Sequence, residues 1–178
     1  MLKNCQRIKS FKGRKKMELF IKQKVFSWKD HFSVKDRQGR DCYLVEGKLF
    51  SWGKKLHVFD QSGKEVLYIE QRLWKWLPTY VLFIEGKEAA VVKQEFSFFK
   101  PRYTIEGPNW RMEGSFGAHQ YQIMESGKVI ADISKEWFTW GDSYALRIND
   151  EAHALLALGI IIVIDCVIAS QQAASSGS

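Results

Sequence analysis

The sequence feature that most constrains the fold is an apolar run from Ala152 to Ala169, whose centre carries no charge. The run is too long for a single strand and is therefore predicted to be a helix, with its core at about residues 150–169. Asn149 and Asp150 are suitable N-cap residues, and Glu151 places an anion in the first turn, where the helix dipole favours it. A helix that is apolar on every side must be surrounded by lipid or by protein.

Three observations favour protein over lipid as the surroundings of this helix. A transmembrane helix requires about 20 predominantly apolar residues, and this run is slightly shorter. Asp165 lies in its C-terminal third, where an unpaired carboxylate is costly in hydrocarbon. No Lys or Arg follows the run as a cytoplasmic anchor. We therefore expect the helix to be buried within the protein itself.

The positive charge of the chain is confined to its N-terminus. The net charge is +7, and the segment before Met17 contains seven cations and no acid. The remaining chain has 20 basic and 20 acidic residues, so a globally basic nucleic-acid-binding domain is not indicated and no specific nucleic-acid recognition is expected. We predict that residues 1–17 form a basic, disordered extension. Residues 171–178 are predicted to form a flexible polar tail.

The cysteines indicate a reducing setting. Cys5, Cys42 and Cys166 form no C-x-x-C pair, and they fall in different parts of the chain: the basic extension, the middle and the apolar helix. This distribution argues against a disulfide framework. We therefore expect a cytoplasmic protein, with peripheral membrane attachment as a further expectation.

A twelve-residue repeat organises the chain between the basic extension and the helix. Complete copies begin at Gln23, Gly47, Gln71, Gln94 and Lys135, and a partial copy spans Met112 to Ile123. Successive starts are 24, 24, 23, 18 and 23 residues apart, a spacing typical of a repeated supersecondary unit.

Each copy has the pattern of a β-hairpin. An aromatic or β-branched run ends in a short turn, which is predicted at 29–31, 53–55, 77–79, 100–102 and 141–143. A second alternating run follows, and a turn that contains Gly or Asp then leads to the next copy. These later turns are predicted at 36–39, 60–63, 85–86, 107–108 and 126–127. Six hairpins give about twelve antiparallel strands before the helix.

The strands and the helix together predict a closed barrel. About eight strands already fill a barrel with side chains, so twelve would leave a lumen. A helix is about 10–12 Å across and can fill that lumen. Closure also removes the exposed sheet edges. We predict a mainly β, single-domain fold over residues 18–170, an antiparallel closed barrel around a central hydrophobic C-terminal helix.

Three segments of the repeat carry a resemblance to a known family. The segments Glu18–Trp28, Gly47–Leu56 and Lys93–Tyr103 resemble the LURP-one-related family. That family belongs to the tubby C-terminal-like group, together with the phospholipid scramblases. The resemblance covers about residues 18–170 and implies a twelve-stranded barrel around a central C-terminal helix. It implies little about activity, because no phosphoinositide headgroup motif, Cys-rich lipidated segment or calcium site matches.

The sequence does not indicate catalysis, a cofactor or a metal. The four histidines have no metal-ligand spacing, and no phosphate-binding glycine motif is present. Ser115-Phe116-Gly117 lacks the upstream glycine of a nucleophile elbow, and no Ser/His/Asp set can be assembled. We therefore expect a non-enzymatic protein that binds no cofactor.

Asp165 is the most informative single residue. On a buried helix, an ionised carboxylate is costly unless it is paired or hydrogen-bonded. Asp165 therefore indicates either a polar pocket within the barrel core or a group near the barrel mouth that meets a Lys, an Arg or water.

One end of the predicted barrel collects cations beside aromatic residues. The turns there contain Lys54, Lys55, Lys100 and Arg102, near Trp28, Trp52, Trp76, Phe99 and Trp140. Such aromatics suit the headgroup level of a bilayer, but they also form cross-strand pairs that pin hairpins. We hypothesise that the four cations bind anionic lipid headgroups or an acidic protein.

Two functions remain open. The first is a non-catalytic binding or scaffold protein, with peripheral association to an anionic membrane and a monomer as the favoured state. The second is a carrier or sensor of a small apolar ligand held between barrel and helix.

Overall fold

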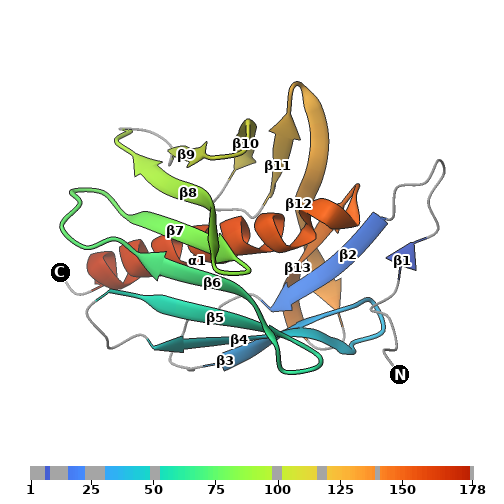
Figure 1. Ribbon diagram of the computed structural model, residues 1–178. Coiled ribbons are helices and arrows are strands. Elements are labelled where there is room, and N and C mark those ends of the chain that lie inside the picture. The colour runs from blue at the N-terminus through green and yellow to red at the C-terminus, as the bar shows by residue number, and fades with distance from the viewer. Residues whose placement is uncertain are drawn as a thin grey trace.

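The computed structural model describes residues 7–8, 16–22, 31–48, 53–97, 102–115, 120–138 and 141–176. It shows an antiparallel sheet that curls around one long helix (Figure 1). The strands are β1 (Arg7–Ile8), β2 (Lys16–Lys22), β3 (His31–Lys35), β4 (Asp41–Lys48), β5 (Lys55–Asp60), β6 (Glu65–Gln71), β7 (Thr79–Ile84), β8 (Lys87–Glu95), β9 (Arg102–Glu106), β10 (Trp110–Ser115), β11 (Gln120–Glu125), β12 (Lys128–Phe138) and β13 (Gly141–Ile148).

The sheet runs in the order β10-β11-β12-β13-β2-β3-β4-β5-β6-β7-β8-β9, and β1 pairs with β2 outside this path. Every ladder is antiparallel. Strand β13, the last in the chain, pairs with β2, which is the first strand of this path in the chain. The outermost strands, β9 and β10, lie beside each other without a ladder among the described residues. The predicted fold class is therefore confirmed: twelve antiparallel strands form a nearly closed barrel with a C-terminal helix.

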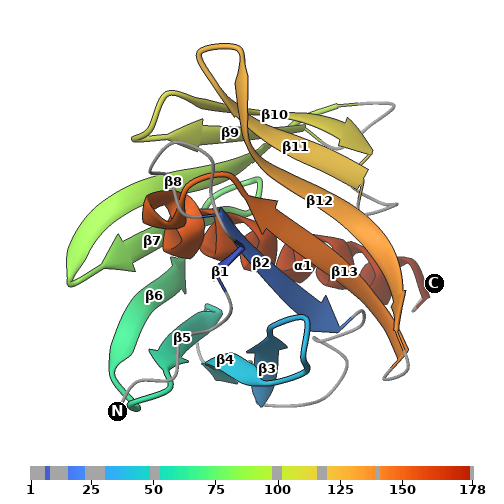
Figure 2. The same ribbon diagram turned by 90° about the vertical axis from the view of Figure 1, so that its right-hand side faces the viewer.

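The helix α1 (Ala154–Ser176) runs through the barrel and follows a short 3₁₀ turn, η1 (Glu151–His153) (Figure 2). Asp150 is the N-cap, as predicted, because its side chain accepts a hydrogen bond from the Ala152 amide at 3.1 Å. The helix continues past Ala169 to Ser176, so the prediction of a flexible tail is wrong for residues 171–176. Extending a formed helix adds a hydrogen bond with each residue ordered, and Ala and Gln are good helix formers.

The repeat explains how the strands surround the helix. Its tenth and twelfth residues alternate with outward-facing neighbours and point into the barrel. The twelfth residues are the buried aliphatics Val34, Val58, Leu82, Ile105, Ile123 and Leu146. The tenth residues are the partly buried Phe32 and the buried Leu56, Tyr80, Tyr103, Tyr121 and Tyr144. Two layers of side chains therefore enclose the helix, and four of the six tenth positions are tyrosines.

The helix packs against the barrel wall without intervening space at Gly159. A Cβ atom at this position would lie 2.6 Å from Leu82 Cδ2 and 2.8 Å from Leu67 Cδ2. A side chain at this position would therefore require Leu82 and Leu67 to move away from α1. The residues from Ala157 to Val167 are buried, including Ile160 to Ile164 at 0%. The centre of the apolar run is thus covered by protein on all sides, whereas its two ends are partly exposed.

The turns between hairpin units agree well with the prediction. Turns follow β3, β5, β7, β9 and β11 at or within one residue of the expected positions. Asp36 and Asp60 stabilise equivalent turns, since each accepts hydrogen bonds from the amides two and four residues later, at 2.8 to 3.1 Å. Within the hairpins the prediction is less accurate. Residues 141–143 are not a turn but the start of β13, paired with Phe138 to Glu136.

Two expectations for the N-terminal half also need correction. Arg7–Ile8 and Lys16–Met17 are paired strands, so the extension is ordered at those points, and the rest of residues 1–15 lies outside the described residues. Cys42 is disulfide-bonded, whereas Cys166 is free and buried. The pattern of cysteines along a sequence does not reveal which of them meet in space. The cytoplasmic setting remains a prediction.

Candidate functional site

The candidate site lies at one end of the barrel, which we call the rim. Because neighbouring strands are antiparallel, the connections after β2, β4, β6, β8, β10 and β12 all lie at this end. The described rim residues are 53–54, 72–78 and 96–97, together with the first residues of the strands that follow. Helix α1 begins at the opposite end and ends at the rim (Figure 1).

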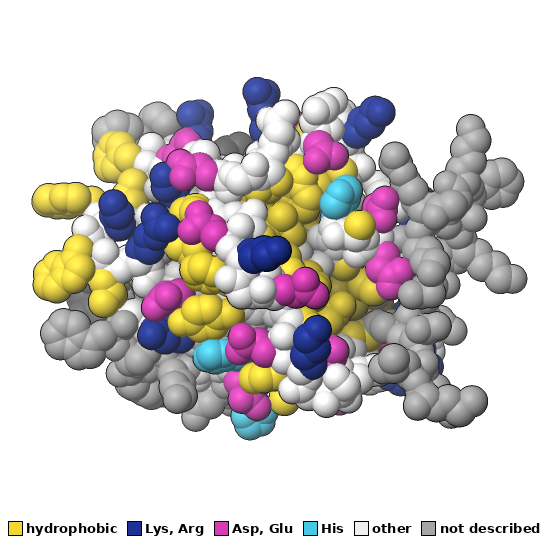
Figure 3. Space-filling model, viewed as in Figure 1, with side chains coloured by type: hydrophobic (Ala, Val, Ile, Leu, Met, Phe, Trp, Pro, Cys, Tyr) yellow, Lys and Arg dark blue, Asp and Glu magenta, His cyan; other side chains and the backbone are white. Residues whose placement is uncertain are grey.

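Exposed apolar side chains gather at the rim. The exposed large hydrophobic residues in the described part of the chain are Leu73, Trp74, Trp76 and Phe96. Their exposures are 41%, 92%, 103% and 72%. The space-filling view shows apolar side chains projecting at the left, beside a group of cations (Figure 3). The first three residues lie in the β6–β7 connection, and Phe96 lies directly after β8.

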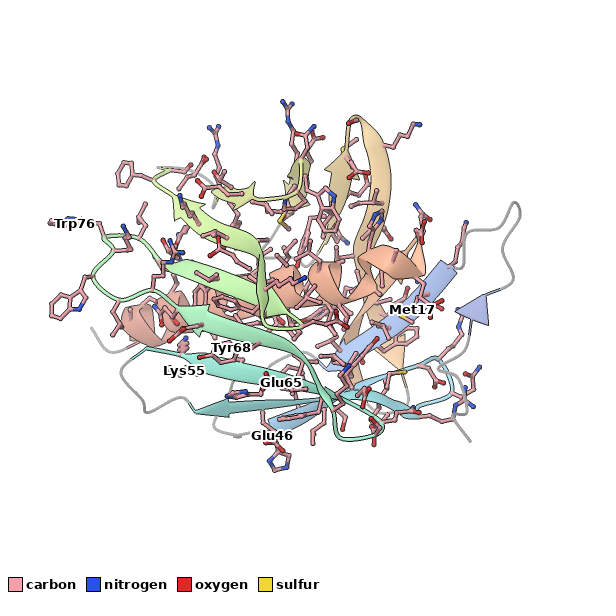
Figure 4. All side chains as sticks on the ribbon, viewed as in Figure 1. Met17, Glu46, Lys55, Glu65, Tyr68 and Trp76 are labelled. Atoms are coloured by element: carbon pink, nitrogen blue, oxygen red, sulfur yellow. The ribbon has the colours of Figure 1, made fainter. Side chains whose placement is uncertain are left out.

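The β6–β7 connection is held at its base. The Arg72 amide donates to the Thr79 carbonyl at 2.8 Å, and the Gln94 amide donates to the Pro78 carbonyl at 2.9 Å. The Thr79 hydroxyl donates to the Leu77 carbonyl at 3.2 Å. These bonds fix both ends of the loop, while its two tryptophans remain exposed. In Figure 4, Trp76 projects outward, away from the barrel.

Trp74 has an unusual backbone conformation. Its φ angle is +63°, in the left-handed region that bulky side chains rarely adopt. This conformation costs a side-chain-bearing residue roughly 1–2 kcal/mol. The exposed ring gains no burial in return. Stability alone therefore does not explain a tryptophan at this position.

Two of the predicted anion-binding cations already have partners. Lys54 Nζ donates to the Cys166 carbonyl at 3.1 Å and to Ser170 Oγ at 2.5 Å, near the end of α1. Lys55 forms an ion pair with Glu70 at 3.3 Å, and hydrogen bonding to Glu70 raises the pKa of Lys55. Lys54 and Lys55 thus have structural roles that the repeat did not reveal.

The other two predicted cations lie elsewhere on the rim. Arg102 is exposed at the start of β9, and Lys100 lies outside the described residues. Strands β6, β7 and β8 separate Arg102 from Lys55, a distance of about 19 Å at the usual strand spacing. The structure therefore places Lys54, Lys55 and Arg102 at one end but does not bring them into a single cluster.

Sequence reasoning missed Lys75. It assigned residues 71–76 to a strand, but β6 ends at Gln71 and residues 72–78 form a loop. Lys75 lies in that loop between the two exposed tryptophans, and neither Lys75 nor Arg102 forms an ion pair within the described part of the chain. The available sequence signals were Pro78, which disfavours a continuous central strand, and the loss of apolar–polar alternation in Leu-Trp-Lys-Trp-Leu.

Asp165 is buried inside the barrel, next to the residue that contacts Lys54 of the rim. It is 8% exposed and accepts a hydrogen bond from the Tyr144 hydroxyl. Burial raises the pKa of Asp165 well above its usual value. Burial also raises the pKa of Tyr103 to about 12, and the charge of Asp165 contributes to that shift. Asp165 therefore lies among inward-facing tyrosines of the repeat.

The residues around Asp165 come from widely separated strands. Tyr103 is on β9, Tyr121 on β11 and Tyr144 on β13, and the field of Asp165 acts on both Tyr103 and Tyr121. Burial raises the pKa of the neighbouring Cys166 thiol to about 12, which makes it a poor nucleophile. No group of three or more His, Cys, Asp or Glu residues suited to a metal occurs among the residues that the structure describes.

The comparisons with known proteins concern nearly the whole barrel and helix. The chain is 40% identical over 156 residues to the uncharacterized protein YxjI of Bacillus subtilis (strain 168), covering 88% of this chain and 96% of that protein. A crystal structure of a protein from Arabidopsis thaliana has a similar fold, with a TM-score of 0.60 and 18% identity, over 85% of this chain and 91% of the other. At that identity, the likeness concerns the fold alone.

The family resemblance noted in the sequence is confirmed, whereas the wider relation to tubby domains and scramblases remains a prediction. The model of the LURP-one-related family matches residues 17–165, which extend from β2 to the buried aspartate of α1. The match includes all the strands of the barrel path and the apolar part of the helix that they enclose. The chain therefore belongs to the LURP-one-related family.

Proposed function

We propose that this protein is a non-catalytic binding module that docks on anionic membrane surfaces through its rim. The observation that carries the proposal is the pair of rim cations without ion-pair partners in the described residues, Lys75 and Arg102, beside exposed aromatic side chains. Cations without a counter-ion attract an anionic surface over a long range, and each contributes on the order of 1 kcal/mol near such a membrane.

The sequence of the rim connections supports the same conclusion. The connections at this end are residues 23–30, 49–54, 72–78, 96–101, 116–119 and 139–140, and they contain six Lys or Arg residues but one acid, Asp30. The connections that follow β3, β5, β7, β9, β11 and β13 at the opposite end contain three cations and four acids, and the connection between β1 and β2 at that end, residues 9–15, adds four cations. The local charge of the rim is therefore positive, although the chain after residue 16 is formally neutral.

The four predicted cations differ in how readily they could bind an anionic partner. Lys54 and Lys55 are engaged with the helix end and with Glu70, so an anionic partner would compete with existing contacts. Lys75 and Arg102 have no such competition, and Lys100 remains a predicted contributor. We therefore assign the main electrostatic contribution to Lys75 and Arg102.

The carrier alternative has less support. A ligand held between helix and barrel requires space, but Leu67 and Leu82 contact the helix directly at Gly159. Asp165 also occupies part of the interior with a polar group, which suits an apolar ligand poorly. An internal ligand would bind without dependence on lipid charge, so the experiment below separates the two functions.

The test measures cosedimentation with phosphatidylserine-containing vesicles at low and high salt. The parent is the full-length chain with the seven basic residues of segment 1–16 changed to Ser, so that binding reports on the rim. We expect Lys75→Ser/Arg102→Ser to reduce binding at low salt by about tenfold. The matched control is Lys64→Ser/Lys87→Ser, which removes two cations near the turns of the opposite end.

Added salt should weaken binding of the parent, because screening shortens the reach of these charges. Equal loss in the two double variants would contradict docking through the rim. Failure of the parent to bind at low salt would contradict membrane docking altogether.

A further inference from the structure

We infer that the rim inserts its aromatic side chains into the bilayer, with the β6–β7 loop as the leading element. This inference rests on the proposed function and adds a second contact to it: an apolar one, made by Trp74, Trp76 and Phe96. The cations would attract the protein to the surface, and the aromatic side chains would hold it there.

The three aromatic side chains lie on neighbouring connections of the same end. Trp74 and Trp76 are in the loop between β6 and β7, and Phe96 follows β8. Strands β7 and β8 pair directly, and the Gln94 amide is bonded to the Pro78 carbonyl. The base of the loop is therefore attached to the segment that leads to Phe96, which keeps the two apolar elements close together.

The loop is shaped before any partner binds. The Arg72 and Thr79 bonds close its base, and Arg72 also pairs with Glu88 at 3.4 Å. Leu73 packs beside Gly53 of the neighbouring connection, where a Cβ on that glycine would lie 3.2 Å from Leu73 Cδ2. A loop held in this way exposes its tryptophans with little further loss of conformational entropy on docking.

The chemistry of these residues favours a bilayer as the partner. Tryptophan has an apolar body and one N–H donor, a combination enriched at the membrane interface. Arg72, Lys75 and Arg102 flank the aromatic side chains, and no acid occurs in residues 72–78 or 96–97. An anionic bilayer offers an apolar interior to the aromatic side chains and negatively charged headgroups to the cations.

The left-handed backbone at Trp74 is consistent with this role. The φ angle of Trp74 is positive, and its side chain nevertheless remains 92% exposed. Unfavourable backbone geometry that brings no burial is characteristic of functional loops. Insertion would bury the ring that the folded protein alone leaves in water.

The experiment uses the full-length chain, with the basic segment neutralised as above, and vesicles of phosphatidylcholine and phosphatidylserine. Binding is measured at high salt, where electrostatic attraction is screened and the apolar contact dominates. We expect Trp74→Ser/Trp76→Ser to lower partitioning by about a hundredfold, since each buried aromatic contributes a factor of roughly ten. The matched variant Trp74→Phe/Trp76→Phe keeps the apolar surface and should retain most of the binding.

The depth to which the rim tryptophans enter the bilayer is measured with lipids that are brominated along their acyl chains. Bromine should quench the tryptophan fluorescence of the parent on vesicle binding, and the quenching should fall strongly in the Phe variant. Soluble glycerophosphoserine, the headgroup without acyl chains, should not compete at high salt.

Each outcome has a defined meaning. Binding that survives the Ser substitutions, or that glycerophosphoserine displaces at high salt, would overturn insertion while leaving electrostatic docking intact. Quenching that is identical in the parent and the Phe variant would also overturn it. A parent that binds no vesicle at low salt would instead remove the proposed function itself.

Discussion

The two ends of the barrel are built in different ways. At the opposite end, short turns are closed by their own side chains: Asp36 and Asp60 each accept hydrogen bonds from two later amides. At the rim, the connections are longer, and they contain Phe26, Trp28, Phe50, Trp52, Trp74, Trp76, Phe96, Phe98, Phe99, Phe116 and Trp140. The connections that follow β3, β5, β7, β9, β11 and β13 at the opposite end contain no Phe, Trp or Tyr.

This difference separates stability from binding. Asp36 is 1% exposed and pairs with Arg40 at 2.6 Å, so this turn of the opposite end satisfies its buried carboxylate internally. The rim leaves Trp74 and Trp76 in water and two cations without ion-pair partners in the described residues. Residues at the opposite end are explained by the fold that they close. The exposed residues of the rim require a partner to explain them.

The largest expected effect concerns the helix that joins the two ends. Ile162 is fully buried at the centre of α1. Ile162→Asp would place a charge in the core without a partner, at a cost of several kcal/mol, comparable to the whole stability of a domain. We expect no cooperative thermal transition in a circular dichroism melt. A soluble variant that unfolds cooperatively would contradict the central-helix fold. It would then also contradict the comparison between the rim and the opposite end of the barrel.

A smaller effect is expected when one residue at each end is replaced, because only the residue at the opposite end should contribute to the free energy of unfolding. Asp36→Ala leaves the Gln38 and Arg40 amides without their acceptor and should lower the free energy of unfolding by about 1–3 kcal/mol. Trp76→Ser removes an exposed ring and should change it by less than about 0.5 kcal/mol. Urea denaturation of both variants provides the measurement. Equal destabilisation would show that the rim aromatics are structural.

The pH dependence of stability tests the polar core next to the rim. The folded pKa of Asp165 is raised by burial, so the folded state retains a proton that the unfolded state releases. Stability should therefore fall as pH rises from about 4 to the folded pKa, and it should stay lower above that value. Asp165→Asn removes this slope and should be more stable than the parent at neutral pH, by more than about 1 kcal/mol.

The titratable groups around Asp165 should not change their protonation state near neutral pH. Tyr144 donates a hydrogen bond to it, and Tyr103, Tyr121 and Cys166 have pKa values raised above their ordinary ranges. These groups therefore remain neutral near pH 7. A wild-type protein with the same pH profile as the Asn variant would show that Asp165 is ionised at little cost.

The smallest expected effect concerns the strained residue of the rim. Trp74→Gly relieves the left-handed backbone but adds freedom to the unfolded chain, so stability should change by about 0–1 kcal/mol in the favourable direction. Vesicle binding should nevertheless decrease. Thermal melts and cosedimentation of the same sample provide both values. Loss of stability together with loss of binding would indicate that the ring supports the loop.

The sequence predicted the regular part of the molecule because that part repeats. The tenth and twelfth residues of each copy must face the helix, so Tyr80, Leu82, Tyr144 and Leu146 are buried as the alternation requires. Asp165 was identified because a carboxyl group is conspicuous on an apolar helix. Its partner Tyr144 is 21 residues away in sequence, and their contact depends on the closure of the barrel.

The rim was predicted less well for a related reason. The repeat located its connections, but it could not distinguish engaged cations from available ones. Lys54 contacts Cys166 of α1, 112 residues later in the chain, and Lys55 meets Glu70 across the sheet. Lys75 was assigned to a strand because it falls in the aromatic run of the repeat copy that begins at Gln71, before the turn predicted at 77–79. Tertiary contacts, rather than local pattern, decided each of these three roles.

The measurement that tests the central claim most directly is hydrogen–deuterium exchange of the full-length protein with and without phosphatidylserine vesicles. We predict slower exchange in peptides covering residues 72–78 and 96–97, because docking through the rim excludes water from these connections. Exchange at the turns 36–40, 61–64 and 85–86 should remain unchanged. Protection centred on those turns, or spread equally over both ends, would contradict the assignment of binding to the rim.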